Sequence, residues 1–213
     1  MDIDLLTLRK WFSAISERII QNCDNLIELD SVNGDGDLGI SMSNGFRAVS
    51  AYLSGTDETD LGRLFMKCSK EFNESAPSSL GTIISIALMG MAKVLKGKEK
   101  TDIPGLAAAM ENGLDAIMDK AKSKPGEKTI LDSLTPAVKT LKDNGNDGFD
   151  VFKKAAVAAA EGSENTKNML SVHGRAAYYG DKSLGVLDGG SVVGKLIFEA
   201  IADAIDNGRE ISG

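Results

Sequence analysis

Apolar residues recur at intervals of three and four along most of this chain, and this spacing constrains the fold more than any other feature of the sequence. In residues 4–25, for example, Leu8, Phe12, Ile15 and Ile19 follow one another at these intervals. Residues spaced in this way lie on one face of an α-helix. Sustained alternation of apolar and polar residues, which would indicate half-buried strands, is absent from the sequence. We therefore expect an all-α protein.

The helical pattern recurs in seven further segments, whose ends carry residues that start or stop helices. Thr59-Asp60 is a cap-like pair before the third segment, Pro104 opens the fifth, and Asn207-Gly208 follows the last. The connections are short, so about eight antiparallel amphipathic helices should pack into a closed bundle or barrel. The predicted helices span approximately residues 4–25, 40–53, 61–74, 78–95, 103–122, 130–141, 147–160 and 191–205.

Length and composition bear on domain organisation and on partners. A chain of 213 residues is long enough for one sizeable core, and no linker-like stretch divides it, so residues 1–213 are predicted to form a single domain. Its 8 methionines and low aromatic content of 5% suit close helix packing. The net charge of −7, with Lys and Arg scattered rather than clustered, argues against a nucleic-acid partner.

Nothing in the sequence predicts a membrane or an export signal. The first four residues, Met1-Asp2-Ile3-Asp4, are acidic where a signal peptide would be basic. The longest apolar stretch, residues 82–95, is shorter than the roughly 20 residues that span a bilayer. We expect a cytoplasmic protein with no membrane partner. Cys23 and Cys68 lie in apolar helical patterns, without metal-ligand spacing, and are interpreted as two buried thiols.

Two segments, residues 28–39 and 173–190, are predicted to be long loops rich in Gly and Asp, and such loops are usually functional. The first contains Asp30, Asp35 and Asp37 within eight residues. Its glycines allow sharp bends, so the three carboxylates could converge on a hard cation such as Mg²⁺ or Ca²⁺. A solvated turn is the alternative interpretation. An EF-hand does not fit, because a loop starting at Asn33 has Leu38 and not Gly at its sixth position.

The second loop offers candidate phosphate-binding groups. Arg175 could bind a phosphate through its fork of donors, although an ordinary ion pair would also explain it. Asp188 begins a Gly-rich turn before a predicted helix, whose first amides could face a ligand. The adjacent segment, residues 189–195, matches part of a phosphate-binding P-loop, but no strand precedes it and Leu196 replaces the required Ser or Thr. His173, the single histidine, is interpreted as a loop or helix-terminal residue and not as a nucleophile.

Four segments, in order along the chain, resemble the nucleotide-binding family of dihydroxyacetone kinases, that is, the L subunit or its fused-domain equivalent. The resemblance extends from the first helix almost to the end of the chain. Two of the segments match the family's Gly-Arg-Ala-Ser-Tyr-Leu-Gly-Glu-Arg-Ser and Pro-Gly-Asp-Lys-Thr-Met-x-Asp. The four segments are Leu29 to Gly39 with Met42 and Gly45-Phe46, Leu80-Gly81-Thr82, Pro125 to Asp132, and Gly174 to Ser183 followed by Leu187 to Ser191.

The resemblance implies a nucleotide pocket at one end of the helical barrel. It implies that Asp30, Asp35 and Asp37 hold two Mg²⁺ ions, that the nucleotide is ADP or ATP, and that Arg175 is catalytic. Gly126 and Thr129 would then lie beside the adenine or the ribose. The nucleotide-binding residues that it implies are Leu38, Gly39, Ser41, Ser75, Ala76, Ser78, Ser79, Gly126, Thr129, Ile130, Arg175, Asp188, Gly189 and Gly190.

The resemblance also implies a function that is divided between subunits. The chain would transfer a phosphoryl group to dihydroxyacetone or a related ketose held by a partner subunit, with ATP or a phosphotransferase-system protein as the phosphoryl donor. The sequence departs from the family at residues 73–78, where Asn-Glu-Ser-Ala-Pro-Ser replaces Gly-Gly-Ala-Ser-Gly-Pro. Two alternatives stay open: a Mg-nucleotide-binding regulatory subunit without transfer activity, and a helical module that binds Ca²⁺ or Mg²⁺ alone.

Overall fold

The computed structural model describes residues 2–210 and confirms the all-α prediction: apart from one antiparallel bridge between Ile3 and Thr101, the regular structure in this range is helical. Five of the described helices begin at side-chain caps, in which Asp4, Asp60, Ser78, Asp102 and Asp188 each accept a hydrogen bond from a first-turn amide. The α-helices are α1 (Leu5–Gln21), α2 (Cys23–Asn33), α3 (Leu38–Gly55), α4 (Leu61–Ser75), α5 (Ser79–Leu95), α6 (Ile103–Ala121), α7 (Leu131–Asn144), α8 (Val151–Asn165) and α9 (Gly189–Glu210), and the 3-10 helices are η1 (Gly145–Asp150), η2 (Thr166–Asn168) and η3 (Arg175–Ser183).

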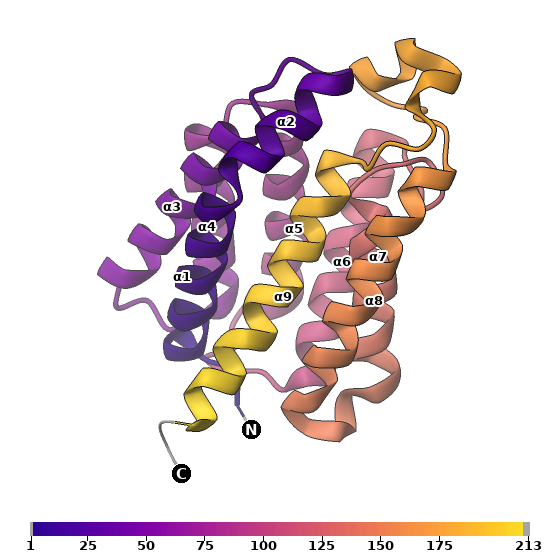
Figure 1. The fold of residues 1–213 in the computed structure, drawn as a ribbon. Helices are drawn as coiled ribbons and strands as arrows, with labels where there is room; N and C mark the ends of the chain where they lie inside the picture. The colour runs from indigo at the N-terminus through magenta and orange to yellow at the C-terminus, as the bar shows by residue number, and fades with distance from the viewer. Residues whose placement is uncertain (1, 211–213) are drawn as a thin grey trace.

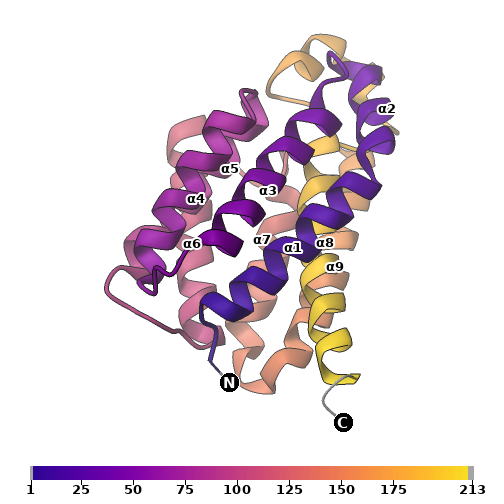
Figure 2. The ribbon, with the colours of Figure 1, turned by 90° about the vertical axis from the view of Figure 1, so that its left-hand side faces the viewer.

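Eight of the α-helices form a closed ring, as the sequence predicts (Figure 1). Each helix from α3 to α8 packs against the next helix along the chain. The last helix, α9, packs against α1, and α1 packs against α3. The amphipathic pattern explains this arrangement, because a helix with one apolar face buries it by turning that face toward a common axis. The remaining helix, α2, lies at one end of the ring, beside the segment that contains η3 (Figures 1 and 2).

The predicted loop at residues 28–39 is wrong in its first half. The first predicted helix ends at Gln21, and after Asn22 the chain continues as α2 up to Asn33. Leu26 of α2 is fully buried and Leu29 is partly buried against the core, and these residues hold the helix on the ring. Asp30 therefore lies on a helix, and only residues 34–37 form the turn to α3. The predicted loop at residues 173–190 also contains the 3-10 helix η3, and α9 begins at Gly189, slightly earlier than predicted.

The apolar faces meet in a core that follows the axis of the ring. Trp11 packs against Phe149 and Phe152, and Phe46 against Phe72. A cavity of about 110 Å³, lined almost entirely by carbon, lies among these helices. Cys68 is buried as predicted, and burial raises the pKa of its thiol to about 12, whereas Cys23 is only partly buried and both thiols are free. Among the described residues, every helix is too short or too polar to cross a bilayer.

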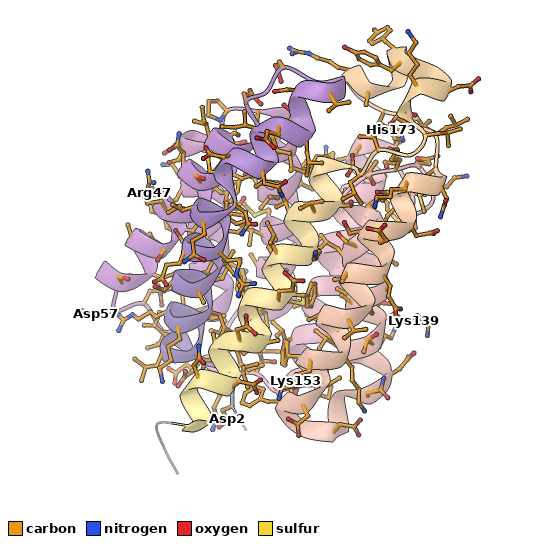
Figure 3. All side chains as sticks on the ribbon, viewed as in Figure 1. Asp2, Arg47, Asp57, Lys139, Lys153 and His173 are labelled. Carbon is orange, nitrogen blue, oxygen red and sulfur yellow. The ribbon has the colours of Figure 1, made fainter. Side chains whose placement is uncertain are left out.

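The two ends of the ring differ in what they present. The end that contains α2 and η3 gathers the segments with unusual composition, and His173 lies there (Figure 3). Asp2, Asp57, Lys139 and Lys153 project from other parts of the surface (Figure 3). The candidate site therefore lies at the end of the ring that contains α2 and η3.

Candidate functional site

Three carboxylates converge where α2 meets α3. Asp30 comes from the last turn of α2, and Asp35 and Asp37 come from the turn that follows. One oxygen from each of the three side chains lies within 4.8 Å of the other two. Asp30 Oδ2 accepts hydrogen bonds from the amides of Gly36 at 2.8 Å and Asp37 at 3.2 Å, so the helix side chain itself shapes the turn. The predicted convergence of the three aspartates is thus present in the structure.

Two glycines are required for this turn. A Cβ atom at Gly34 would lie 2.2 Å from Asp30 Oδ1, which is far inside contact distance. Gly36 has a φ of 74°, in the left-handed region that residues with side chains rarely adopt. The backbone conformation of the Gly-Asp-Gly-Asp sequence therefore places the carboxylates close together, although their like charges repel.

The electrostatics of the cluster favour a cation. Burial, and then the charges of Asp35 and Asp30, raise the pKa of Asp37, which means that these surroundings disfavour its ionised form. The one cationic side chain in contact with the cluster, within the described part of the chain, is Arg175, whose guanidinium pairs with Asp35. Three oxygens from hard, anionic ligands without His or Cys fit Mg²⁺ or Ca²⁺ better than zinc. The residues present therefore fit the metal that the sequence predicts.

The cluster lies in a cleft of about 880 Å³, whose walls come from five parts of the chain. One wall is the beginning of α5, where Pro77, Ser78 and Ser79 line the cleft. Ser78 caps this helix by accepting from the Gly81 amide at 3.1 Å, and its Oγ atom lies 2.6 Å from that of Ser41. The N-terminus of a helix carries partial positive charge and amide donors, so this wall suits an anionic group.

A second wall is the turn that leads into α7. Asp132, a buried carboxylate in the first turn of α7, accepts from the amides of Gly126 at 2.5 Å and Thr129 at 2.7 Å. Thr129, Ile130 and Leu131 line the cleft beside this capped turn. The turn is therefore rigid and offers a mixed apolar and polar surface.

The third wall is the segment between α8 and α9, which contains η3. His173, Gly174 and Arg175 line the cleft, and His173 Nε2 lies 2.6 Å from Glu127 Oε2. This contact joins the segment to the turn before α7, and it lowers the pKa of Glu127. His173 lies in a loop, as predicted, but the sequence did not indicate that it reaches the cleft.

Asp188 is placed at the base of the cleft, before α9. Its Oδ2 accepts from the Ser191 amide at 2.6 Å, as a helix cap does, and its own amide donates to Thr166 Oγ1 at 3.0 Å. Removal of water from around the Asp188 carboxyl raises its pKa to about 7, and the charge of Asp132 raises it further. The rejected P-loop is part of α9: Gly194 and Lys195 are helical, and Gly194 packs against Ser133 of α7.

The structure brings most of the predicted site residues together, but not all of them. Those that line the cleft are Asp30, Asp35, Asp37, Leu38, Ser78, Ser79, Thr129, Ile130, Arg175, Asp188, Gly189 and Gly190.

The others lie behind the cleft lining. Gly39 allows α3 to approach α2, since a Cβ there would lie 2.2 Å from the Cys23 carbonyl oxygen. Ser41 supports Ser78, and Gly126 shapes the turn before α7. Ser75 ends α4 and the buried Ala76 follows it, and the cleft lining begins at the next residue, Pro77.

Several cleft residues were not predicted. Lys128, Ser123, Pro77 and the apolar pair Ile117 and Ala121 line the cleft. Lys128 stood within a motif that the sequence singled out, and its left-handed φ of 60° shows that the turn there is unusual. The apolar residues carried no signal, because their spacing is that of any buried helix face.

Comparison with known proteins gives consistent results. Residues 32–203 match the model of the DAK2 domain. The ADP-binding subunit of PEP-dependent dihydroxyacetone kinase 1 from Listeria innocua is 31% identical over 192 residues, which cover 90% of this chain and 92% of that protein. The human triokinase/FMN cyclase is 35% identical over 188 residues, which cover 86% of this chain but 32% of the longer protein.

A search of solved structures matches the dihydroxyacetone kinase of C. freundii. In its native form the TM-score is 0.77, with 21% identity, over 94% of this chain and 34% of that chain. The same enzyme in complex with AMP-PNP and Mg²⁺ gives a TM-score of 0.73 over 92% of this chain and 33% of that chain, again at 21% identity. At this identity the match supports the fold of the helical ring.

Proposed function

Because the chain belongs to the DAK2 domain family, we propose that it is the Mg-nucleotide-binding subunit of a dihydroxyacetone-type kinase. It holds ADP or ATP in the cleft and transfers a phosphoryl group to a small ketose that a partner subunit presents. The observation that carries this proposal is the convergence of Asp30, Asp35 and Asp37 in a cleft that the start of α5 and Arg175 also line. We further propose that residues 1–213 act as one nucleotide-binding domain, since α1 and α9 close the same ring.

Each part of the cleft has a role in this proposal. Asp30, Asp35 and Asp37 would hold Mg²⁺, two ions in the family arrangement, and the metal would neutralise phosphate charge. Ser78 and Ser79 at the start of α5 offer hydroxyls and helix-terminal amides to phosphate oxygens. Thr129 and Ile130 form the wall against which the nucleoside lies. Arg175, which pairs with Asp35, turns its donors to the transferred phosphoryl group and stabilises its charge in the transition state.

Phosphoryl transfer requires positioning and charge stabilisation more than covalent chemistry, so such a cleft is sufficient for the nucleotide half of the reaction. Two cleft side chains that could act on a hydroxyl are committed within the fold: His173 contacts Glu127, and Asp188 caps α9. The ketose and the group that orients its hydroxyl should therefore come from a partner. The relatives named above support a divided function, since the Listeria protein is named an ADP-binding subunit and the chain spans about a third of the triokinase.

The segment around η3 supports a partner at the mouth of the cleft. Large apolar side chains are exposed along it, and Tyr178 is 92% exposed. Figure 3 shows that side chains of this segment project outward at the cleft end. Exposed apolar side chains that gather in one segment commonly mark a protein interface. The exposed large apolar residues of this segment are Leu170, Val172, Tyr178, Tyr179 and Leu184.

A coupled kinase assay tests the proposal. The purified chain is measured with dihydroxyacetone alone and with a ketose-binding subunit, using ATP in one series and a phosphotransferase-system donor in the other. We expect turnover only with the subunit. Arg175→Ala should lower the rate by about 100-fold or more while it changes ADP affinity much less, and Tyr178→Ser should raise the concentration of partner that is needed.

The outcomes separate the alternatives. Rapid turnover by the chain alone would disprove the divided function. Binding of Mg-ADP without turnover, with every partner and donor, would favour the regulatory subunit that the altered residues 73–78 leave open.

A further inference from the structure

Lys128 carries a buried charge to which the proposed reaction assigns no role. It is 5% exposed, and among the residues whose burial is described it is the one buried cation. The described contacts of its ammonium are with backbone carbonyls, and none of them is an ion pair. Nζ donates to the oxygens of Ser183 at 2.6 Å, Val186 at 2.6 Å and Thr166 at 2.8 Å, and Met169 O lies at 3.3 Å. An ammonium has three protons, so these carbonyls satisfy it fully.

The four carbonyls that contact Lys128 come from both ends of the segment that contains η3. Thr166 and Met169 precede η3, Ser183 is its last residue, and Val186 follows it. A single ammonium therefore joins the two ends of residues 169–186. Backbone contacts reinforce the junction, since Gly185 N donates to Lys167 O at 2.8 Å and Ser171 N to Ser183 Oγ at 3.1 Å. The segment is a closed loop with Lys128 at its base.

The same turn also reaches the cleft side of the loop. Glu127, next to Lys128, contacts His173, which lies two residues before Arg175. On its other side Lys128 is followed by Thr129 and Ile130, which line the cleft. Lys128, with its left-handed backbone, stands between Glu127, which contacts the loop through His173, and Thr129, which lines the cleft. The nucleoside wall and the loop that carries Arg175 are thus fixed by one short turn.

We propose that Lys128 is a positioning residue: its ammonium closes the loop of residues 169–186 and thereby holds Arg175 over the carboxylate cluster. Burial lowers the pKa of Lys128, while the neighbouring charge of Asp188 raises it, and the four carbonyl dipoles favour the charged form. The role in catalysis rests on the proposed function, whereas the closure of the loop does not.

The first test is hydrogen exchange on the chain without nucleotide or partner. Lys128→Met keeps the length of the side chain and removes its charge and donors. Lys122→Met is the matched control, because Lys122 has a similar left-handed φ of 52° but an exposed ammonium, 3.2 Å from Asp119. We expect exchange in residues 169–186 to rise at least about tenfold in Lys128→Met and to stay unchanged in the control, with the ring helices protected in both.

The second test is a double-mutant cycle in the reconstituted kinase. If Lys128 acts through Arg175, Lys128→Met should lower kcat by about 100-fold with little change in nucleotide KM, because small displacements of a catalytic group cost that much. The same substitution should change the rate less than about threefold when Arg175 is already alanine. A structural role alone would reduce both backgrounds equally.

The results that overturn the proposal are distinct. Native protection of the loop in folded Lys128→Met excludes closure by the ammonium, and equal rate losses in both backgrounds exclude action through Arg175. Lys128→Gln, which keeps two donors, should give intermediate exchange. Loss of the whole ring in both variants would also contradict the proposal, because the four carbonyls belong to η2 and the loop and not to the ring. If hydrogen exchange rises in Lys128→Met as expected but the kinase assay shows no turnover, the proposed function is disproved and the loop closure still stands.

Discussion

Two charged centres face the same cleft and are built in opposite ways. At the carboxylate cluster, like charges lie within 4.8 Å of one another and raise the pKa of Asp37. At Lys128, a single charge is surrounded by carbonyl oxygens at hydrogen-bond distance. The first centre is held together by backbone geometry against its own repulsion, whereas the second is complete within the fold.

This difference separates binding from architecture. A charge whose partners are all present is stable without a ligand, so its removal should harm the empty protein. Charges that repel one another gain from an added cation, so their removal should harm only the liganded protein. Within one cleft, the state of electrostatic satisfaction thus indicates which residues bind a ligand and which hold the site in place.

The largest expected effect is ligand-dependent stabilisation through the unsatisfied centre. At about 100 times its dissociation constant, Mg-ADP should raise the free energy of unfolding by about 2.7 kcal/mol if it binds only the folded state. Asp37→Asn should abolish this gain. Thermal unfolding with ADP and Mg²⁺, each alone and together, measures it. A melting temperature that ignores Mg-ADP and rises with Ca²⁺ alone would favour the metal-binding module instead.

The next effect sharpens the contrast between the two centres in the absence of ligand. Lys128→Met leaves buried carbonyls without a donor, so we expect the free energy of unfolding to fall by about 2 kcal/mol. Asp37→Asn relieves repulsion and should leave stability unchanged or slightly higher. Urea unfolding of both variants, followed by circular dichroism, measures the difference. Equal losses in the two variants would remove the distinction.

A smaller effect concerns Asp188, which lies between the two centres. Burial raises its pKa from the ordinary 3.8 to about 7, so in this pH window the folded protein retains a proton that the unfolded chain has released. The free energy of unfolding should therefore fall as the pH rises from about 4 to about 7, by at most about 1.4 kcal/mol per pH unit from this group. Asp188→Asn should flatten that slope, as urea unfolding at several pH values would show. An unchanged slope would mean that Asp188 is ionised throughout.

The helices of the ring were predictable from sequence because each carries an apolar stripe long enough to establish its period. Trp11, Phe12 and Ile15, for example, are all buried, as their spacing indicates. The α2 helix was only partly predicted, because Leu26 is its one fully buried residue among those whose burial is described, and the Asp and Gly residues beyond it resemble a loop. Short helices with one anchor depend on tertiary contacts that local patterns do not encode.

The convergence of Asp30, Asp35 and Asp37 was predictable from sequence, because the glycines that permit the turn stand between them. The positions of Ser75 and Ala76 were harder to predict, because a match to a family motif does not show where α4 ends. The role of Lys128 was not predictable either. Its four partners lie 38 to 58 residues away and are backbone atoms, which leave no mark in the side-chain sequence.

Calorimetric titration of ADP with excess Mg²⁺ tests the central claim, that the carboxylate cluster is the metal-dependent nucleotide site, most directly. The native chain is compared with Asp35→Asn, Asp37→Asn and the control Asp57→Asn, an exposed aspartate beyond the other end of α3 (Figure 3). We expect the affinity for ADP to fall by about 100-fold or more in Asp35→Asn and Asp37→Asn, equivalent to about 2.7 kcal/mol. Helicity should be retained, and the ADP affinity of the control should be unchanged. Unchanged ADP affinity in Asp35→Asn and Asp37→Asn would contradict it.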